Sequence, residues 1–532
     1  MSETLGQFLD AVCARSPESE AVAFAPGPKV AARMTWRELR EESRRAARKL
    51  IGLGVTRGTR VALLCSNRIE WLPLAFGALR IGAVLVPLST LWKRDEIAYA
   101  LRLSEARLLL MLRGFLKHDY LQSVNEIAPE LAGSDPGRLA ASAVPALQRV
   151  VLLGSESAAG AQAWETVDEA ASDLVLNTME AETSPADLAT IFFTSGTTSQ
   201  AKAVVHRHSA LVSSGRRLAP CFGITSEDSW WGHMPLFWSG GFVLGALATL
   251  AGGGRIVLHE SVTPDSALEL LATERCTIMA GWHQAGPLLE HAGFSRDRIH
   301  LRKGTYHSLA PRLMGPDNCA IGVYGMSETA TCVTAAHWDD PEPIRTATFG
   351  RPLAGMELKI IDPETRAPRP AGEPGEILVK GPSLMEGYLN VAPSETFDPE
   401  GFFRTGDLGY FDDSGHLHFA NRLKDVIKTA GVNVAAVEVE EALTRHPAIK
   451  AAHVVGVPHP VRGENIAAFV VTDAELDPEE VRGFCRSSLA SYKVPKFVFA
   501  ITEADVPRTG TGKIEKVALR RLAGERAATG GS

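Results

Sequence analysis

The sequence Ala189-Thr-Ile-Phe-Phe193 runs directly into Thr194-Ser-Gly-Thr-Thr-Ser199, and this junction indicates how the chain folds. The first stretch is typical of a buried strand. Five of the six residues after it carry hydroxyl groups, and Gly196 relaxes the backbone in their middle. Hydroxyls and backbone N–H groups at the end of a strand can cradle a polyphosphate, and Lys202 would add a cation. A Ser/Thr-rich surface turn is the alternative interpretation of this segment by itself.

The residues before this junction alternate between strand and helix patterns. Short, continuously apolar runs are typical of strands covered on both faces. They occur at 61–65, 83–86, 108–112 and 150–153. An amphipathic helix is predicted over 38–53 and a further helix over 70–80. This alternation predicts βαβ units, largely parallel sheets and ligand sites at the carboxyl ends of the strands.

The pattern changes after Gly350. From there to Phe419 the chain is rich in Gly, Pro and short β-prone runs, which predicts a small, mostly antiparallel β unit. The last hundred residues have an alternation of their own, which predicts a separate α+β domain. Its expected elements are a helix at 437–445, strands at 451–457 and 466–471, and a helix at 478–489. We therefore expect two domains, 1–421 and 422–532.

Composition excludes several classes of function. The 532 residues include 45% hydrophobic and 22% charged residues, as in globular proteins, and the formal net charge of −7 gives no basic surplus for nucleic acid. The seven cysteines are scattered without ligand spacing, which favours reduced thiols in a cytoplasmic protein. The longest apolar stretch, 242–251, is too short for a membrane span and predicts a buried core helix.

A second glycine- and hydroxyl-rich loop, Arg508-Thr-Gly-Thr-Gly-Lys513, lies near the C-terminus. Neither this loop nor the first contains the GxxxxGK[ST] pattern of a P-loop. Two lysines on such loops, one in each predicted domain, could meet at a shared anionic ligand. A solvated loop lysine is the alternative for Lys513.

Seven motifs in order resemble those of the adenylate-forming (ANL) superfamily, which comprises acyl-CoA synthetases, peptide-synthetase adenylation domains and luciferases. The first is Phe193-Thr-Ser-Gly-Thr-Thr-Ser-Gln-Ala-Lys202. The others are Pro235-Leu-Phe-Trp238 with Gly240, Tyr324-Gly-Met-Ser-Glu328, Gly375-Glu-Ile-Leu-Val-Lys-Gly-Pro382 with Gly387-Tyr388, Thr405-Gly-Asp407, Arg422-Leu-Lys-Asp-Val-Ile-Lys428 and Pro507-Arg-Thr-Gly-Thr-Gly-Lys513. The match spans nearly the whole chain.

The resemblance implies an α/β fold. Its large N-terminal domain would contain two stacked αβ sheet lobes and a small β subdomain, followed by a mobile α+β C-terminal domain with its hinge near Lys424. It also implies an AMP-forming carboxylate–CoA ligase that uses ATP, Mg²⁺ and coenzyme A. The partners would be a small-molecule carboxylic acid, ATP and CoA, without nucleic acid or a membrane span, and a homodimer is one expected assembly.

The resemblance also carries a set of site residues. It implies ATP or AMP contacts from Thr194, Ser195, Gly196, Thr197, Thr198, Lys202, Gly304, Thr305, Tyr324, Gly325, Met326, Ser327, Asp407, Arg422 and Lys513. The acid pocket would include Trp238, Gly240, Gly241, Trp282 and Tyr306, and the CoA channel Gly431 and Trp238. Lys513, Thr198 and Glu328 would be catalytic, with Glu328 and Thr198 holding the metal.

Chemistry explains why such residue types suit these roles. Glu328 offers hard oxygen atoms to Mg²⁺. Asp407 can accept two short bonds from the ribose hydroxyls. Lys513 would reach the α-phosphate during adenylation only, which requires the small domain to rotate before a thiol enters. A side chain at Gly431 would obstruct that thiol.

The substrate and the thiol acceptor stay open. No acidic residue lies in 236–241, so an α-amino acid is disfavoured, because its buried ammonium would have no counter-charge. Aromatic residues near this motif favour an aryl, alicyclic or medium- to long-chain acyl group. Besides a CoA ligase, we consider a ligase that loads a carrier-protein pantetheine. A catalytically degenerate nucleotide-binding homologue is the third hypothesis, because Ser199, Ala201 and Ala203 depart from the family pattern.

Overall fold

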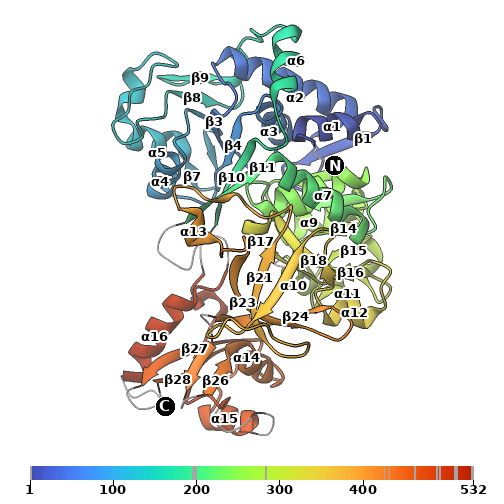
Figure 1. The fold of residues 1–532 in the computed structure, drawn as a ribbon, viewed down its shortest axis with the longest axis vertical. Coiled ribbons are helices and arrows are strands. Elements are labelled where there is room, and N and C mark those ends of the chain that lie inside the picture. The colour runs from blue at the N-terminus through green and yellow to red at the C-terminus, as the bar shows by residue number, and fades with distance from the viewer. Residues whose placement is uncertain are drawn as a thin grey trace.

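The structure is a computed structural model that describes residues 3–194, 201–281, 284–423, 426–429, 432–459, 463–486, 489, 493–508 and 513–528. It contains a large N-terminal part built on two extensive sheets and a smaller C-terminal part with a sheet of its own (Figure 1). This arrangement confirms the α/β fold with a large N-terminal and a small C-terminal domain.

The first large sheet has eight strands and carries the junction from which the sequence analysis starts. In spatial order they are β22 (Gly387–Tyr388), β11 (Lys202–Arg207), β10 (Leu188–Thr194), β4 (Val84–Pro87), β3 (Arg60–Leu64), β5 (Leu108–Met111), β8 (Arg149–Leu152) and β9 (Ala161–Ala163). Pairing is parallel from β10 to β9 and antiparallel at β11 and β22. The predicted parallel arrangement is therefore confirmed for the centre of this sheet.

The second large sheet has seven strands. They are β16 (Cys319–Ile321), β15 (Lys303–Thr305), β14 (Ile278–Met279), β12 (Ser229–Gly232), β13 (Arg255–His259), β1 (Glu20–Ala25) and β2 (Ala32–Thr35). All neighbours pair in parallel except β1 and β2. Smaller helices, α9 (Pro264–Thr273), α10 (Ala285–Glu290), α11 (Ala310–Met314) and α12 (Glu342–Ala347), accompany this sheet.

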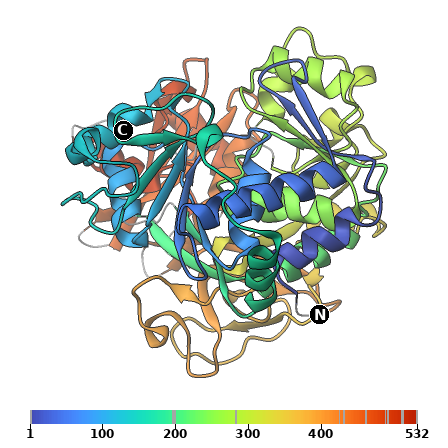
Figure 2. The same cartoon turned by 90° about the horizontal axis from the view of Figure 1, so that it is seen from above.

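Helices from the N-terminal region lie between the two large sheets, as the view from above shows (Figure 2). They are α1 (Leu5–Cys13), α2 (Trp36–Gly52), α3 (Trp71–Arg80), α7 (His208–Cys221), η3 (Gly240–Leu247) and α8 (Ala248–Gly252). The largest hydrophobic cluster takes side chains from these helices and from both sheets, so the two lobes share one core. Helices α4 (Arg94–Ser104) and α5 (Tyr120–Ile127) lie near the short hairpin of β6 (Gly114–Phe115) and β7 (His118–Asp119), and α6 (Asp173–Glu182) lies beside α2 (Figure 1). All three add side chains to the same hydrophobic cluster.

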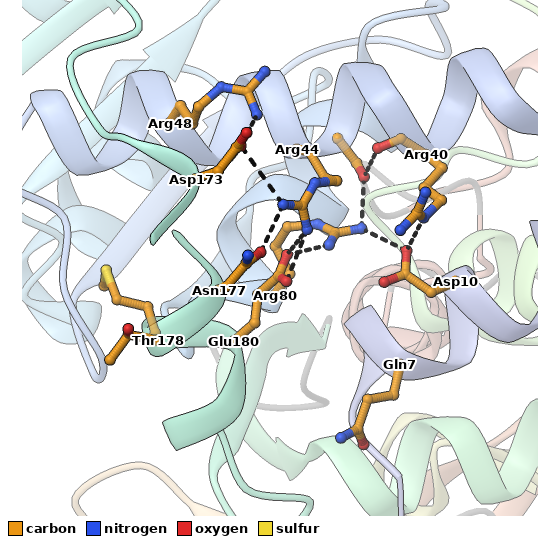
Figure 3. Close-up of polar contacts among 12 residues, drawn as sticks. Gln7, Asp10, Arg40, Arg44, Arg48, Arg80, Asp173, Asn177, Thr178 and Glu180 are labelled. Carbon is orange, nitrogen blue, oxygen red and sulfur yellow. Dashed lines mark hydrogen bonds and ion pairs between the residues drawn. The ribbon is translucent and has the colours of Figure 1, made fainter. Parts of the chain in front are cut away.

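A buried arginine ties four of these helices together (Figure 3). Arg80, at the end of α3, is 1% exposed and pairs with Glu180 of α6 and, at 3.1 Å, with Asp10 of α1. It also donates to the hydroxyl of Ser43 on α2 at 2.9 Å, and Arg44 reaches Glu180 from α2. Because a buried charge is tolerated only when paired, this network fixes the helices relative to one another.

The segment 242–251, predicted as a core helix, is helical but begins as a π-helix. Its first part is η3, and the amide of Ala248 at its end donates to the carbonyl of Val243, five residues earlier. Phe242 is fully buried and its ring lies 5.2 Å from that of Trp71. Because π-helices often occur at functional sites, the difference from the expected helix is informative.

Two small sheets complete the large domain. One comprises β17 (Val323–Met326), β18 (Thr331–Ala335) and β19 (Arg351–Pro352). The other is the predicted antiparallel unit, with β20 (Glu357–Ile361), β21 (Gly375–Lys380), β23 (Phe403–Phe411) and β24 (Leu417–Arg422), and the short helix α13 (Pro393–Thr396) lies nearby.

The C-terminal part has its own sheet and hydrophobic clusters. Its strands are β26 (Val432–Ala435), β25 (Val426–Thr429), β28 (Gly463–Val471), β27 (Ala451–His459) and β29 (Phe497–Ile501), and its helices are α14 (Ala436–Thr444), α15 (Pro478–Arg486) and α16 (Lys516–Ala528). Since β24 runs to Arg422 and β25 begins at Val426, the change from one sheet to the next falls between them, beside the predicted boundary.

Candidate functional site

A large cleft lies between the two domains, with a volume of about 2710 Å³. Residues from both domains line it, and they include Lys202, Glu328 and Asp407 from the N-terminal domain and Lys513 from the C-terminal domain. These four residues come from different motifs of the sequence, and the structure places all of them in one cavity. The ends of the two lysine-bearing loops face the same space.

The two ends of the predicted phosphate loop are held together by the eight-stranded sheet. Thr194 ends β10, Lys202 begins β11, and the two residues are antiparallel register partners. Both line the cleft. The loop residues Ser195, Gly196, Thr197 and Thr198, and Ser199 after them, lie outside the described residues.

Glu328 lies in a short 3₁₀ turn, Ser327–Thr329 (η5), between β17 and β18. Its Oε1 accepts a hydrogen bond from the hydroxyl of Tyr388 at 2.8 Å. Burial, together with the neighbouring carboxylate, raises the pKa of Tyr388 above its ordinary value, so the phenol keeps its proton and donates. The Nζ atom of Lys202 lies 4.5 Å from the centre of the same ring.

The backbone next to Glu328 is fixed by close packing. Ala330 and Thr331 have φ angles of +50° and +99°, which is rare for residues with a side chain and especially for a β-branched one. The hydroxyl of Thr329 donates to the Thr331 carbonyl at 2.6 Å. A Cβ atom at Gly325 would lie 1.7 Å from that same carbonyl oxygen, so only glycine fits there. Strain of this kind is common where a functional side chain is held in place.

Asp407 is 4% exposed and accepts a hydrogen bond from the hydroxyl of Tyr324 at 2.9 Å. Tyr324 packs against Phe419, with the ring centres 6.2 Å apart. The backbone of Arg422 pairs with Asp407 across β23 and β24, while the Arg422 side chain lies outside the described parts of the structure. The residues predicted to contact adenine and ribose are therefore neighbours.

Ser327 connects the Glu328 turn to the segment that contains the predicted acid-pocket residues Trp238 and Gly240. Its carbonyl accepts a 2.7 Å hydrogen bond from Nε2 of His206, and its hydroxyl lies 3.1 Å from that of Ser239. His206 is fully buried, and burial lowers its pKa to about 4, so the ring is neutral at pH 7. Ser327 and Met326 both line the cleft.

The segment 304–306 contains two predicted nucleotide contacts, Gly304 and Thr305, and one predicted acid-pocket residue, Tyr306. Thr305 lines the cleft and its hydroxyl accepts from the Gly281 amide at 2.9 Å. Gly304 is not among the lining residues, and a Cβ atom there would lie 1.8 Å from the carbonyl oxygen of Met279. Gly304 therefore allows β14 and β15 to approach closely. Tyr306, expected in the acid pocket, packs instead against the second hydrophobic cluster.

The part of the cleft predicted to bind the acid includes several apolar side chains. Described residues that line it include Met234, Trp238, Gly240, Leu244 and Leu309. Gly241 does not line the cleft, because its backbone packs against Pro235. A Cβ atom at Gly241 would lie 2.0 Å from the carbonyl oxygen of Pro235. Of the polar lining residues, His307 has its pKa lowered by burial, and Glu290 is exposed.

The remaining predicted residues divide between the cleft and the parts that are not described. Lys513 is an exposed cleft residue. Trp282, Lys424 and Gly431 lie outside the described residues. The sequence did not predict the hydrogen bonds of Tyr388 and His206 or the cleft positions of Met234 and Leu244. Of these residues, Tyr388 lies in a motif, Gly387-Tyr388, that could have indicated a role in the site.

The donor chemistry around Glu328 fits magnesium. A carboxylate oxygen is a hard ligand, and Mg²⁺ is usually bound through one or two carboxylates with water and phosphate oxygens completing the shell. Glu328 lines the cleft, and the hydroxyl of Tyr388 bonds its carboxylate, as hydrogen-bond donors behind a metal site commonly orient the ligands.

Comparisons with known proteins agree with this geometry. The profile of the family described as AMP-binding enzyme matches residues 9–389, and that of the AMP-binding enzyme C-terminal domain matches residues 438–513. The chain is 30% identical over 539 residues to a putative acyl-CoA synthetase, YngI, of Bacillus subtilis, covering 97% of this chain and 96% of the relative.

A second relative and a solved structure extend the comparison. The chain is 32% identical over 509 residues to the 3-[(3aS,4S,7aS)-7a-methyl-1,5-dioxo-octahydro-1H-inden-4-yl]propanoyl:CoA ligase of Mycobacterium tuberculosis, covering 92% of this chain and 94% of the relative. The crystal structure of ATP-bound MatB from Rhodopseudomonas palustris is similar with a TM-score of 0.81 and 26% identity, covering 98% of this chain and 99% of that one. In the part of the chain that the structure describes, no helix is long and apolar enough to cross a membrane.

Proposed function

From the premise that this chain belongs to the AMP-binding enzyme family and is an ATP-dependent acyl-CoA synthetase, we propose that its substrate is an apolar, non-amino-acid carboxylic acid. The observation that carries this proposal is the apolar end of the interdomain cleft, which continues from the charged residues Lys202, Glu328 and Lys513. The acyl group would occupy the apolar end, and its carboxylate would face the cations.

The lining of the acid end supports an aryl, alicyclic or medium- to long-chain acyl group. Trp238, Met234 and Leu244 offer apolar surface at the acid end. A buried ammonium group would need a counter-charge there. The nearby carboxylate of Glu290 is solvent-exposed, so it does not supply a buried one. The relative from Mycobacterium tuberculosis, whose name specifies an alicyclic propanoyl group, is consistent with this substrate class.

The reaction has two steps. A carboxylate oxygen of the acid attacks the α-phosphorus of ATP and displaces pyrophosphate, which gives an acyl adenylate. The sulfur of CoA then attacks the acyl carbonyl, AMP leaves with the bonding electrons, and the thiol proton passes to solvent. Both steps bring anions together, so cations placed where charge develops lower the barrier.

We assign the roles as follows. Lys513 and Lys202 neutralise the phosphates and the attacking carboxylate, and Asp407 holds the ribose hydroxyls beside Tyr324. Glu328 would hold Mg²⁺, which supplies charge neutralisation at the phosphates when bound. The C-terminal domain would rotate about the hinge predicted near Lys424 before CoA enters past Gly431, and both of these residues lie outside the described part of the chain.

An ATP–pyrophosphate exchange panel tests this proposal. Aryl, alicyclic, medium- and long-chain acids are compared with amino acids, and Glu328→Gln serves as the inactive control. We expect exchange with at least one apolar class and none with amino acids. Exchange that is greatest with an amino acid would overturn the substrate class, and no exchange with any acid would favour the degenerate homologue.

The thiol acceptor is tested with the best acid. CoA and a phosphopantetheinylated carrier protein are added separately and AMP release is measured. AMP release that depends on CoA is expected, whereas release with the carrier protein alone would identify the carrier-loading alternative. A homodimer and a cytoplasmic location stay predictions, which light scattering and cell fractionation can check.

A further inference from the structure

The loop after the central strand β3 contacts the second large sheet. Asn67 lies in this loop and is 6% exposed. Its side-chain amide donates to the carbonyls of Gly232 at 2.9 Å and Met234 at 2.8 Å, and its side-chain oxygen accepts from the backbone amide of Leu236 at 2.9 Å. All three bonds go to backbone groups of one five-residue segment.

That segment forms one side of the acid end of the cleft. Gly232 ends β12, Met234 lines the cleft, and the chain then reaches Trp238 and Gly240, which also line it. Among the residues that the structure describes, none pairs as a strand with the backbone between Gly232 and the start of η3, so the conformation of this segment depends on other contacts. Asn67 supplies three of them from the opposite lobe.

The loop that carries Asn67 is itself held on both sides. The hydroxyl of Ser66 donates to Glu260 at 2.5 Å, just after β13, and the Arg68 guanidinium lies 3.7 Å from the same carboxylate. The following helix, α3, places Trp71 against Phe242 of the π-helix. The contacts of Ser66, Arg68 and Trp71 therefore hold the loop independently of segment 232–236.

We infer that Asn67 is a positioning residue for the acid substrate. It fixes the backbone of 232–236 and thereby the position of Met234 and Trp238, which form one wall of the cleft. The expected effect on the KM for the acid rests on the proposed function. Loss of the three bonds would leave two carbonyls and an amide without their partners and allow the wall to move. The ATP-binding residues on β10, β17 and β23 make none of these contacts.

Three variants test the inference. Asn67→Ala removes all three bonds, and Asn67→Asp keeps the acceptor for Leu236 but removes both donors at nearly constant volume. Asn318→Ala is the matched control, because Asn318 is also 6% exposed and also bonds backbone groups, those of Gly315 and Ala320, before β16.

Two readouts are needed. In pyrophosphate exchange, Asn67→Ala is expected to raise the KM for the acid at least tenfold while the KM for ATP stays within twofold. Asn67→Asp should raise the KM for the acid at least as much, because its carboxylate oxygen would face the carbonyls of Gly232 and Met234. Asn318→Ala should leave both KM values unchanged. In hydrogen exchange of the ligand-free protein, peptides covering 232–247 are expected to exchange faster in both Asn67 variants than in Asn318→Ala.

The outcomes separate this inference from the proposed function. If the wild-type protein exchanges pyrophosphate but the Asn67 variants change the KM for acid and ATP alike, or neither, the positioning role is wrong. Unchanged hydrogen exchange at 232–247 overturns it whether or not the protein is active. If the wild-type protein is inactive with every acid, the proposed function fails while the hydrogen-exchange result still decides the inference. If Asn67→Ala does not fold, Asn67→Asp provides both readouts.

Discussion

The hydroxyl of Tyr388 donates a 2.8 Å hydrogen bond to the carboxylate of Glu328, across sixty positions of sequence. Lys202 lies over the same aromatic ring, so one tyrosine contacts both an anion and a cation of the cleft. The hydroxyl of Tyr388 bonds Oε1 of Glu328, so this bond does not use the second carboxylate oxygen. The hydrogen bond orients the carboxylate that is proposed to hold Mg²⁺.

Tyr388→Phe is expected to weaken magnesium binding. The variant keeps the ring over Lys202 and loses only the bond to Glu328. Loss of such a second-shell partner typically costs roughly 10- to 100-fold in metal affinity or activity. A Mg²⁺ titration of pyrophosphate exchange should therefore shift to higher concentrations, with the KM for the acid unchanged. Tyr410→Phe, which alters a tyrosine stacked on His418 outside the cleft lining, is the control. Identical Mg²⁺ titrations in Tyr388→Phe and the wild type would refute the role.

Gly240→Ala is expected to narrow the acid pocket without harming the fold. An added Cβ atom would meet only the terminal methyl group of Met234, at 2.7 Å, and that side chain can move. The ratio of kcat/KM for bulky over slender acids should fall by roughly tenfold, since one methylene is worth about 10- to 200-fold in a hydrophobic pocket. Gly241→Ala is the contrast, because it would meet the Pro235 backbone and should lower the melting temperature. Equal effects of both variants on stability would show that the two glycines have been assigned incorrectly.

Asp407→Asn is expected to affect ATP rather than the acid. A carboxylate accepts charge-assisted bonds from both ribose hydroxyls, whereas an amide offers a single neutral oxygen. The KM for ATP should rise by roughly tenfold, and the KM for the acid should stay within twofold. This is the opposite of the pattern expected for Asn67→Ala. A change confined to the acid would place Asp407 in a different role.

His206 should make the protein less stable in acid. Its pKa is lowered to about 4 by burial, whereas an unfolded histidine titrates near 6.5. Below pH 6.5 the unfolded chain therefore binds a proton that the folded chain does not. The free energy of unfolding consequently decreases as the pH is lowered. Between pH 7.5 and 5.5 this single residue should cost roughly 1 kcal/mol of the free energy of unfolding. His206→Gln should lose less stability over that interval in urea unfolding. An unchanged pH dependence would mean that His206 titrates normally.

The local patterns predicted much of the fold. The runs at 61–65 and 108–112 form β3 and β5, because short strands that are covered on both faces are apolar throughout. The helix at 38–53 became α2, with Thr35 and Glu38 forming its capping box. By contrast, the π-helix at 240–247 was not predicted, since a change of hydrogen-bond spacing leaves no mark on composition.

The site was predictable only where a motif carries it. Glu328 and Asp407 stand in recognisable motifs, and both line the cleft. The contacts of Asn67 with 232–236 and of Tyr388 with Glu328 join segments far apart in sequence, and nothing local in either segment specifies the partner. Tyr306 was predicted in the acid pocket but packs against a hydrophobic cluster. The sequence alone does not distinguish these two positions, because an aromatic side chain suits a pocket and a core equally well.

The central claim is that residues from both domains form one adenylating site, and Lys513→Ala tests it most directly. Pyrophosphate exchange and thioester formation from supplied acyl adenylate and CoA are measured on the same preparation. We predict that exchange is lost while transfer to CoA is retained, because Lys513 serves only the step that forms the adenylate. Equal loss of both steps, or exchange at the wild-type rate, would contradict the account.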